Sequence, residues 1–331
     1  FYVDDGSLSS IHFKNGKLVK EKKVVNAVNG VSFHIDESEV FSLVGESGCG
    51  KTVTSLSLIK LIGENGVITA DEITLNGRDI RNINKEEARL IRGKEISMIF
   101  QEPMTSLNPV YKIEKQIGEM IKIHNKGISK AEIKEKSIEI LKKVGVPNPE
   151  ERLKAYPHEL SGGLRQRVMI AIALACNPSM VIADEPTTAL DVTIQAQIID
   201  LLKELQKDFN TSILLITHDF GVVSQLADRV AVMYAGKIVE AGTLKQIIEK
   251  PLHPYTELLI HSIPGIKVKK GERLKTIEGQ VPNPLNFPSG CRFNPRCPYA
   301  TERCKNEEPP TIEIDGRAVS CFLRSEEGKH E

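Results

Sequence analysis

A glycine-rich stretch early in the chain has the residue types and spacing of a phosphate-binding loop (P-loop). It fits the pattern G-x-x-x-x-G-K-[ST] and consists of Gly45, Glu46, Ser47, Gly48, Cys49, Gly50, Lys51 and Thr52. In such a loop the glycines let backbone N–H groups curl around phosphate oxygens, and the following helix adds its positive end. Lys51 then reaches the terminal phosphates, and the Thr52 hydroxyl can bind Mg²⁺. The stretch predicts a nucleoside triphosphate as ligand, because its strand and helix flanks argue against a chance glycine turn.

Two adjacent carboxylates could carry out the chemistry on that nucleotide. Asp184 and Glu185 follow directly after an apolar run over residues 180–183. Asp184 lies at the carboxyl end of a predicted buried strand and is expected beside the P-loop. Proteins with a P-loop hold Mg²⁺ at this place. Glu185 can orient and polarise a water for in-line attack on the γ-phosphate. Without the neighbouring P-loop, a solvated loop residue would be an equally good interpretation of either acid.

Hydrophobic periodicity predicts the elements that must position these residues. Apolar runs predict buried strands over residues 40–44, 96–100, 180–184 and 212–216. Val31, Phe33 and Ile35 alternate with polar residues, which predicts a further, half-buried strand. Residues 52–61 are expected to be helical, and a second helix after Asp191 has core spacing at Ile194, Ile198, Leu201, Leu202, Leu205 and Phe209. These apolar side chains are interpreted as packing residues, and the whole pattern predicts an α/β core.

Residues 112–156 have helical rather than strand periodicity. Ser129 and Glu132 form a capping-box pattern, and Ile133, Ile140 and Val144 share the face that follows. The segment therefore predicts a helical insertion within the α/β core.

Length and charge limit the classes of function. The chain has 331 residues, which predicts one large α/β module and a smaller second one. Lys+Arg and Asp+Glu balance at 44 each, so no net charge gathers nucleic acid or anionic lipid. No run of eighteen apolar residues occurs, and the sequence after Phe1 has no secretory pattern. We expect a cytoplasmic protein, trimmed at its N-terminus, that reaches a membrane only through protein partners.

The stretch Leu160-Ser161-Gly162-Gly163-Leu164-Arg165-Gln166-Arg167 resembles the signature of ABC ATPases. The resemblance implies the ABC type of P-loop NTPase fold, with ATP as the nucleotide. It also implies a head-to-tail dimer in which Ser161, Gly162 and Gly163 close over the γ-phosphate held by the opposing subunit. Leu164 stands where the common pattern has glutamine, and we expect little loss because backbone and serine contacts carry the binding.

Further positions match the same family. Gln101 resembles the Q-loop glutamine that contacts Mg²⁺ and senses the membrane subunit, and Asp191 resembles the D-loop aspartate at the dimer interface. His218 resembles the switch histidine that holds the γ-phosphate and the attacking water. A lone glutamine is more often solvent-facing, and a lone histidine more often packs or lies at the surface, so these assignments depend on the neighbouring motifs. The helical insertion corresponds to the ABC helical subdomain, about residues 102–178. Phe13 is the candidate for stacking on adenine, with an edge-strand core residue as the alternative.

The last eighty residues resemble the extension of dipeptide, oligopeptide and nickel importer ATPases. The similarity is carried by His253-Pro254-Tyr255-Thr256, Gln280-Val281-Pro282, Gly290-Cys291-Arg292-Phe293 and Arg296-Cys297-Pro298. It implies a nucleotide-binding domain over residues 1–250 and a small Cys-rich extension over 251–331. The implied function is the ATPase motor of a dipeptide or oligopeptide importer. The alternatives are the same motor for nickel or another small solute, and a soluble ABC ATPase of repair or translation.

Four cysteines crowd into that extension. Cys291, Cys297, Cys304 and Cys321 are separated by five, six and sixteen residues. In a reducing cytosol such a group suggests a metal site before disulfides, although zinc sites prefer closer pairs. Four thiolates suit either zinc or an iron–sulfur cluster, and the resemblance favours a [4Fe–4S] cluster over Zn²⁺ or an empty site. An independent redox or sensing module is a further hypothesis.

The resemblance also implies partners. It implies a second ABC ATPase subunit, a paralogue, in the head-to-tail dimer. It implies two transmembrane permease subunits that hold the pair at the cytoplasmic face of the membrane, and an extracellular or periplasmic peptide-binding protein that acts indirectly. No nucleic-acid partner is expected.

Overall fold

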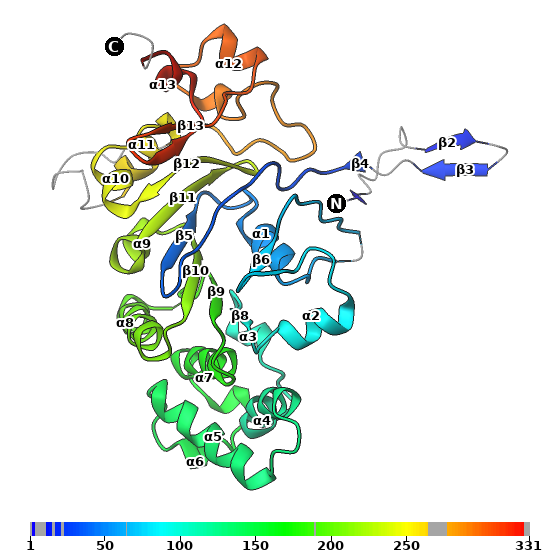
Figure 1. The fold of residues 1–331 in the computed structure, drawn as a ribbon, viewed down its shortest axis with the longest axis vertical. Coiled ribbons are helices and arrows are strands. Elements are labelled where there is room, and N and C mark those ends of the chain that lie inside the picture. The colour runs from blue at the N-terminus through cyan, green and yellow to red at the C-terminus, as the bar shows by residue number, and fades with distance from the viewer. Residues whose placement is uncertain are drawn as a thin grey trace. The chain divides into compact units, whose positions relative to one another are not determined.

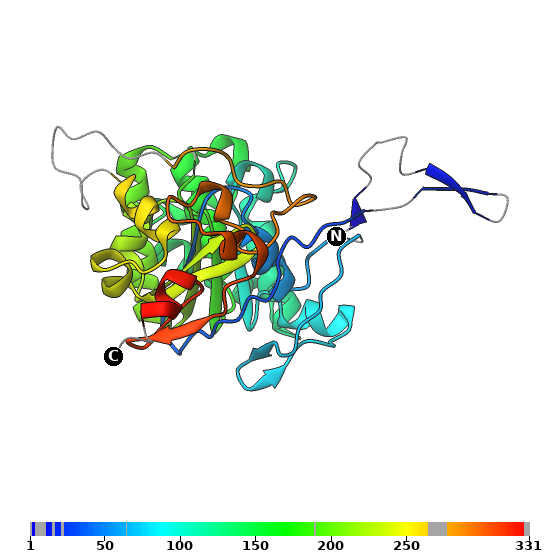
Figure 2. The same cartoon turned by 90° about the horizontal axis from the view of Figure 1, so that it is seen from above.

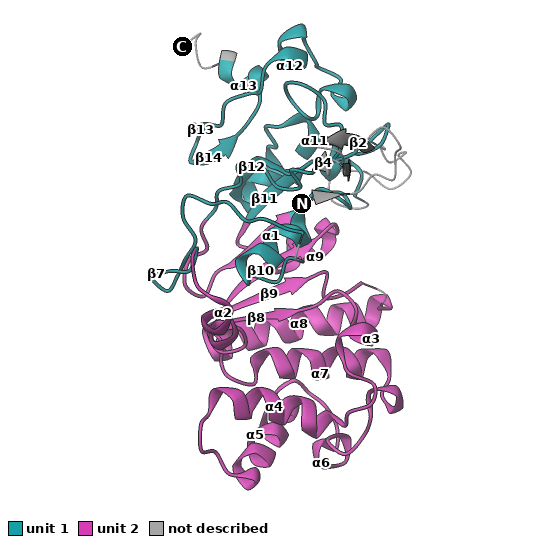
Figure 3. Ribbon diagram, turned by 90° about the vertical axis from the view of Figure 1, so that its right-hand side faces the viewer, with its two compact units in different colours: residues 1–33, 44–81, 230–331 teal, residues 34–43, 82–229 magenta. Residues whose placement is uncertain are grey.

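The computed structural model describes two compact units of the chain (Figure 3). The residues it describes are 2–3, 11–14, 17–20, 23–63, 65–188, 190–263 and 277–327, with side chains from residue 24 to residue 325. Unit 1 contains residues 1–33, 44–81 and 230–331, and unit 2 contains residues 34–43 and 82–229. Each unit therefore combines segments that are far apart in the sequence.

The strands of unit 2 form a sheet in the order β5, β10, β9, β8. Their bounds are Val40–Val44, Ser212–Thr217, Met180–Asp184 and Ile96–Ile99. β9 runs parallel to both β10 and β8, with Met180 opposite Ser212 on one side and Ile96 on the other. All of β10 and all of β8 are buried, as expected for continuous apolar runs in a parallel sheet. The carboxyl ends of three parallel strands therefore lie at one edge.

The helices of unit 2 are α2 Lys85–Ile91, α3 Pro103–Ser106, α4 Ile113–His124, α5 Lys130–Lys143, α6 Pro149–Arg152, α7 Gly162–Leu174, α8 Val192–Phe209 and α9 Phe220–Leu226, with a 3₁₀ turn η2 at Pro157–Glu159. Helices α4, α5 and α7 pack against one another, and α7 also contacts β8 (Figure 1). The predicted capping box begins α5, because Ser129 N donates to Glu132 and Glu132 N donates to Ser129 Oγ. The helical interpretation of residues 112–156 is confirmed.

The core of unit 2 contains the apolar face predicted for the helix after Asp191. Ile198, Leu201, Leu202 and Leu205 of α8 are buried, and Ile194 and Phe209 pack against the same core partly buried. From the helical segment, Ile113, Ile117 and Leu141 are fully buried there. Packing is thus confirmed as the role of these side chains.

Unit 1 combines the P-loop helix with the C-terminal part of the chain. Its strands are β1 Tyr2–Val3, β2 Ile11–Lys14, β3 Lys17–Lys20, β4 Lys23–Val24, β6 Thr74–Leu75, β7 Arg78–Asp79, β11 Arg229–Tyr234, β12 Lys237–Thr243, β13 Ile312–Ile314 and β14 Arg317–Val319. Its helices are α1 Lys51–Leu58, α10 Leu244–Glu249, α11 Pro254–His261, α12 Glu302–Asn306 and α13 Phe322–Glu327, with a 3₁₀ turn η3 at Asn294–Arg296. β14 pairs antiparallel with both β12 and β13. The C-terminal segment, orange to red in Figure 2, therefore adds two strands beside β12, which neighbours β11. A domain division near residue 250 stays a prediction.

Two sequence predictions need correction. Residues 31–36 alternate between partly buried and exposed, as predicted, but they are not part of a strand. Such alternation requires only an extended backbone along a surface and does not require a partner strand. Helix α1 ends at Leu58, before the predicted residue 61, because Lys60 adopts a left-handed φ of 55° and Leu61 N donates to Leu56 O. This is the geometry of a helix C-terminus.

Candidate active site

The P-loop begins where β5 ends and leads into α1, as predicted. A Cβ atom on Gly45 would lie 2.1 Å from the carbonyl oxygen of Met233, so only glycine fits there. Gly50 caps α1 with a φ of 107°, and a Cβ on it would lie 2.8 Å from the carbonyl oxygen of Ala27. The glycines of the motif therefore allow a turn that a residue with a side chain could not form.

Lys51 lies inside this turn. Its side chain is nearly buried, and Nζ donates to the carbonyl oxygens of Gly45 at 2.7 Å and Glu46 at 3.0 Å. The ammonium is thus held within the curl of the loop, while Thr52 is exposed on the first turn of α1. Cys49 is buried, and burial raises the pKa of its thiol. A buried thiol of this kind is unreactive, so Cys49 is a packing residue of the loop.

The candidate carboxylates lie in unit 2, at the carboxyl end of β9. Asp184 is the last residue of the strand and is 1% exposed. Glu185 follows with a φ of 45°, a left-handed conformation that costs a residue with a side chain about 1–2 kcal/mol. Its backbone N–H donates to Ile216 O on the adjacent β10 at 2.8 Å. Strained residues of this kind are concentrated at functional sites.

Three side chains hold the carboxylate of Glu185. Gln101 Nε2 donates to Glu185 Oε2 at 3.0 Å, and Thr188 Oγ1 donates to the same oxygen at 2.9 Å. His218 Nδ1 lies 3.1 Å from Glu185 Oε1. Gln101, Glu185 and His218 follow the adjacent strands β8, β9 and β10, so the sheet itself brings these three predicted residues together. Thr188 belongs to none of the motifs recognised in the sequence.

Gln166 is a second residue that the sequence analysis missed. It belongs to α7, is 1% exposed, and donates from Nε2 to the carbonyl oxygen of Pro186 at 2.6 Å. The signature helix therefore holds the loop that follows Glu185. The position lies inside the signature stretch, but its spacing alone does not reveal this contact.

Ser161 and Asp191 are both helix caps. Ser161 Oγ accepts from Leu164 N at the start of α7, and Asp191 Oδ1 accepts from Ile194 N at the start of α8. Ser161 and Gly162 are exposed, and a Cβ on Gly163 would lie 3.1 Å from Ile194. α7 begins at Gly162, so the signature forms the first turn of a helix. Phe13 lies on β2, but its side chain is outside the described residues.

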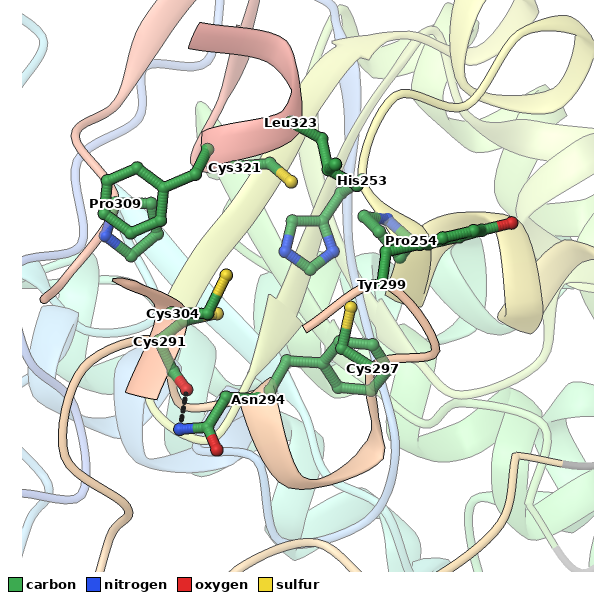
Figure 4. A pocket seen from close by; sticks show the side chains of 12 residues that line it. His253, Pro254, Cys291, Asn294, Cys297, Tyr299, Cys304, Pro309, Cys321 and Leu323 are labelled. Carbon is green, nitrogen blue, oxygen red and sulfur yellow. Dashed lines mark hydrogen bonds between the residues drawn. The ribbon is translucent and has the colours of Figure 1, made fainter. Parts of the chain in front are cut away.

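The four C-terminal cysteines line one small cavity in unit 1. Cys291, Cys297, Cys304 and Cys321 are free thiols, and with the His253 ring they point into this cavity (Figure 4). Burial raises the pKa of Cys291 and of Cys297 to about 11, and the neighbouring cysteines act in the same direction. Burial also lowers the pKa of His253 to about 3. Across the described residues, no group of three or more His, Cys, Asp or Glu has the arrangement of a metal site, so the predicted cluster or zinc site is not confirmed.

Two protein-family models match the chain. The model described as ABC transporter matches residues 28–188. The model described as oligopeptide/dipeptide transporter, C-terminal region, matches residues 239–304. The first match contains the P-loop, Gln101, the signature and Glu185, and the second contains three of the four cysteines.

Known proteins are similar over nearly the whole length. The oligopeptide transport ATP-binding protein AppD of Bacillus subtilis strain 168 is 53% identical over 311 residues, which cover 93% of this chain and 94% of AppD. The dipeptide transport ATP-binding protein DppD of Escherichia coli strain K12 is 48% identical over 313 residues, with 94% of each chain covered. The ATP-binding cassette MJ0796, solved as a dimer with ADP and Pi, is 26% identical with a TM-score of 0.59, and the match covers 71% of this chain and 95% of that one.

These similarities establish the ABC ATPase fold that the resemblance implied, with its mixed α/β sheet. Among the helices of the described residues, none is both long and apolar enough to be a membrane span. The extent and level of identity to AppD and DppD leave one family assignment: the chain belongs to the ABC transporter ATP-binding proteins of the oligopeptide and dipeptide transport family.

Proposed function

We propose that this chain is the ATP-hydrolysing subunit of an ABC importer that powers uptake of dipeptides or oligopeptides. The observation that carries the ATPase role is the Glu185 carboxylate, held by Gln101, Thr188 and His218 at the carboxyl edge of parallel strands. The peptide class rests on the match of residues 239–304 to the oligopeptide/dipeptide transporter C-terminal region. Nickel or another small solute is the alternative cargo.

The P-loop residues fit a bound triphosphate. Gly45 and Gly50 permit the tight turn, and Lys51 already lies within it. In this proposal Glu46, Ser47, Gly48 and Cys49 complete the cradle around the β- and γ-phosphates, and Phe13 stacks on adenine. Thr52, Gln101 and Asp184 would hold Mg²⁺, whose positive charge neutralises the phosphate oxygens when it is bound.

Glu185 orients the attacking water and takes up its proton. Gln101 and Thr188 donate to Glu185 Oε2, whereas His218 contacts Oε1. These contacts fix the orientation of the carboxylate. His218 is the more exposed member, with 57% of its side chain accessible against 13% for Glu185. The exposed His218 ring is therefore accessible to the γ-phosphate of a bound nucleotide.

Partners follow from the exposed signature. Ser161, Gly162 and Gly163 would contact the nucleotide of a second ABC ATPase subunit, a paralogue, in a head-to-tail dimer, with Asp191 at the interface. Two permease subunits would anchor the pair at the cytoplasmic face of the membrane, and a peptide-binding protein would deliver cargo from outside. The dimeric form of MJ0796 supports pairing of such cassettes.

Residues 251–331 form the transporter extension in this proposal, and its cysteines hold a [4Fe–4S] cluster, with Zn²⁺ as the alternative. The support for this proposal is the chemistry of the donors: four free thiols line one cavity, and four thiolates are the usual ligands of such a cluster, whereas their arrangement in the described structure is not that of a metal site. A bound cluster would act as a staple for a segment poor in helix. Iron, sulfide and zinc analysis of protein purified without oxygen tests this. Four irons with four sulfides would support the cluster, one zinc would support the alternative, and absence of both would refute the two.

The ATPase role is tested with Glu185→Gln in the purified chain. Binding of ATP should persist while turnover falls by at least about a hundredfold, and the closed dimer should accumulate. Glu204→Gln on the exposed face of α8 is the matched control. Hydrolysis at the wild-type rate in the Glu185 variant would remove that residue from its role. Uptake of a labelled dipeptide, compared with nickel, by vesicles that carry the assembled transporter decides the cargo.

A further inference from the structure

An arginine of the C-terminal extension reaches the P-loop. Arg296 Nη1 donates to Glu46 Oε2 at 2.7 Å, and Arg296 Nη2 donates to Glu46 Oε1 at 3.0 Å. The pair joins residues 250 positions apart in the sequence. The Arg296 side chain is 4% exposed and that of Glu46 is 29% exposed, so the contact is largely shielded from water. Two parallel charge-assisted bonds of this kind are strong and directional.

Arg296 is itself held in place. Its Nε donates to Glu278 O at 2.9 Å, and its guanidinium carbon lies 5.8 Å from the centre of the Tyr234 ring. It ends the 3₁₀ turn η3, whose preceding residue Phe293 packs edge-on against Tyr234. Backbone and aromatic contacts therefore hold the guanidinium in addition to its hydrogen bonds with Glu46.

The backbone of Glu46 is held from the same part of the chain. Glu46 N donates to the hydroxyl oxygen of Tyr255 at 3.0 Å. Tyr255 is fully buried and packs against Tyr234 and Phe293. Side chain and backbone of one P-loop residue are thus both tied to the C-terminal part of unit 1.

The contacts continue from Glu46 to the lysine of the loop. Lys51 Nζ donates to the carbonyl oxygen of Glu46 at 3.0 Å and to that of Gly45 at 2.7 Å. A change in the orientation of Glu46 therefore moves its carbonyl oxygen, which accepts from Lys51 Nζ. The Lys51 ammonium is the group that is expected to contact phosphate. A chain of hydrogen bonds therefore runs from Arg296 through Glu46 to Lys51.

We propose that the C-terminal extension sets the shape of the P-loop, with Arg296 as a positioning residue for nucleotide binding. This inference rests on the proposed ATPase function and concerns its regulation by the extension. In this proposal Arg296 acts on nucleotide binding through Glu46. Loss of Arg296 leaves a carboxylate with no guanidinium on the loop that must bind a polyanion, which weakens binding in two ways: the loop loses its anchor, and an uncompensated negative charge remains near the phosphates.

The test measures ATP affinity by titration calorimetry and steady-state kinetics on the full-length chain. Arg296→Gln should weaken ATP binding about tenfold or more, the effect of losing a charged hydrogen bond. It should raise KM with little change in kcat, because Glu185 and its partners are untouched. Arg296→Lys keeps the charge without the bidentate geometry and should restore part of the affinity. Arg303→Gln is the control, since that arginine of α12 pairs with the exposed Glu307 instead.

A double variant separates positioning from simple support of the fold. Glu46→Gln removes the carboxylate that Arg296 serves, so Arg296→Gln should have little further effect in that background. Thermal unfolding of each protein is followed alongside. Lower stability with wild-type ATP affinity and KM in Arg296→Gln would overturn the proposal, as would fully additive losses in the double variant. If the wild-type chain neither bound nor hydrolysed ATP, the proposed function would fail instead.

Discussion

Replacing Gln166 by leucine should weaken both stability and turnover. The wild-type amide is buried and donates to Pro186 O at 2.6 Å. Leucine has a similar volume, so it opens no large cavity, but it leaves the Pro186 carbonyl without this buried donor. An unsatisfied buried acceptor costs about 1–3 kcal/mol. We expect the free energy of unfolding to fall by that amount.

The effect on turnover follows from the position of Pro186. It directly follows Glu185, whose φ of 45° must be held by its surroundings. If a looser loop misplaces Glu185 and raises the activation free energy of hydrolysis by about 1.4 kcal/mol, kcat falls about tenfold. ATP binding should change little, because the carbonyl oxygens that hold Lys51 in the P-loop belong to Gly45 and Glu46.

Urea unfolding and steady-state ATPase rates on the same samples check both expectations. Gln225→Leu is the matched control, because this exposed amide donates only within α9, to Gly221 O. It should leave both quantities near the wild-type values. A stability loss in Gln166→Leu with unchanged kcat would show that α7 supports the fold without positioning Glu185, and this would refute the reasoning.

Three further predictions concern single residues. His218→Ala removes the contact to Glu185 Oε1 and should lower kcat by about a hundredfold with ATP affinity retained; equal losses of kcat and affinity would argue against a role in hydrolysis. Gly45→Ala places a Cβ 2.1 Å from Met233 O and should abolish ATP binding in a filter-binding assay, whereas Gly63→Ala, with open space around it, should not. Burial raises the pKa of Glu240, so the folded state binds its proton more tightly than the unfolded chain. The resulting stability is present below the ordinary pKa of glutamate and is lost as the pH rises through the raised value; urea unfolding between about pH 4 and about pH 8 should show this slope, and Glu240→Gln should flatten it.

The parts of the site that the sequence predicts are those governed by local spacing. The P-loop glycines and Lys51 lie within one stretch of eight residues, so the sequence encodes their turn locally. Gln101, Glu185 and His218 are distant in sequence, but each follows a buried strand. The parallel order of β8, β9 and β10 then brings them to one edge without further information.

Other contacts could not be predicted because no local pattern specifies them. Arg296 and Glu46 meet only after residues 250 positions apart have folded into one unit. Gln166 reaches Pro186 through the packing of α7, which the periodicity of a helix does not define. Conversely, Val31 and Ile35 show the alternation of a strand without being in one. Hydrophobic periodicity indicates which side chains are exposed, but it does not show whether the backbone pairs with another strand.

Binding and hydrolysis should be separable by mutation, because their supporting contacts lie in different units. Arg296 and its partners Glu46, Tyr234 and Glu278 belong to unit 1, whereas Gln166 and Pro186 belong to unit 2. Changes at sites without shared partners usually have additive free energies. The double variant Arg296→Gln/Gln166→Leu should therefore combine the KM increase of the first change with the kcat decrease of the second.

The same kinetic assay measures this directly, with both single variants run in parallel. If the free-energy effects on kcat/KM add within about 0.5 kcal/mol, the extension controls how firmly nucleotide is held and the signature helix controls how fast it is cleaved. A double variant no worse than Arg296→Gln alone would mean instead that both residues act on one shared state of the P-loop and Glu185. That outcome would make the extension part of the hydrolytic step, and the separation argued from the two units would be wrong.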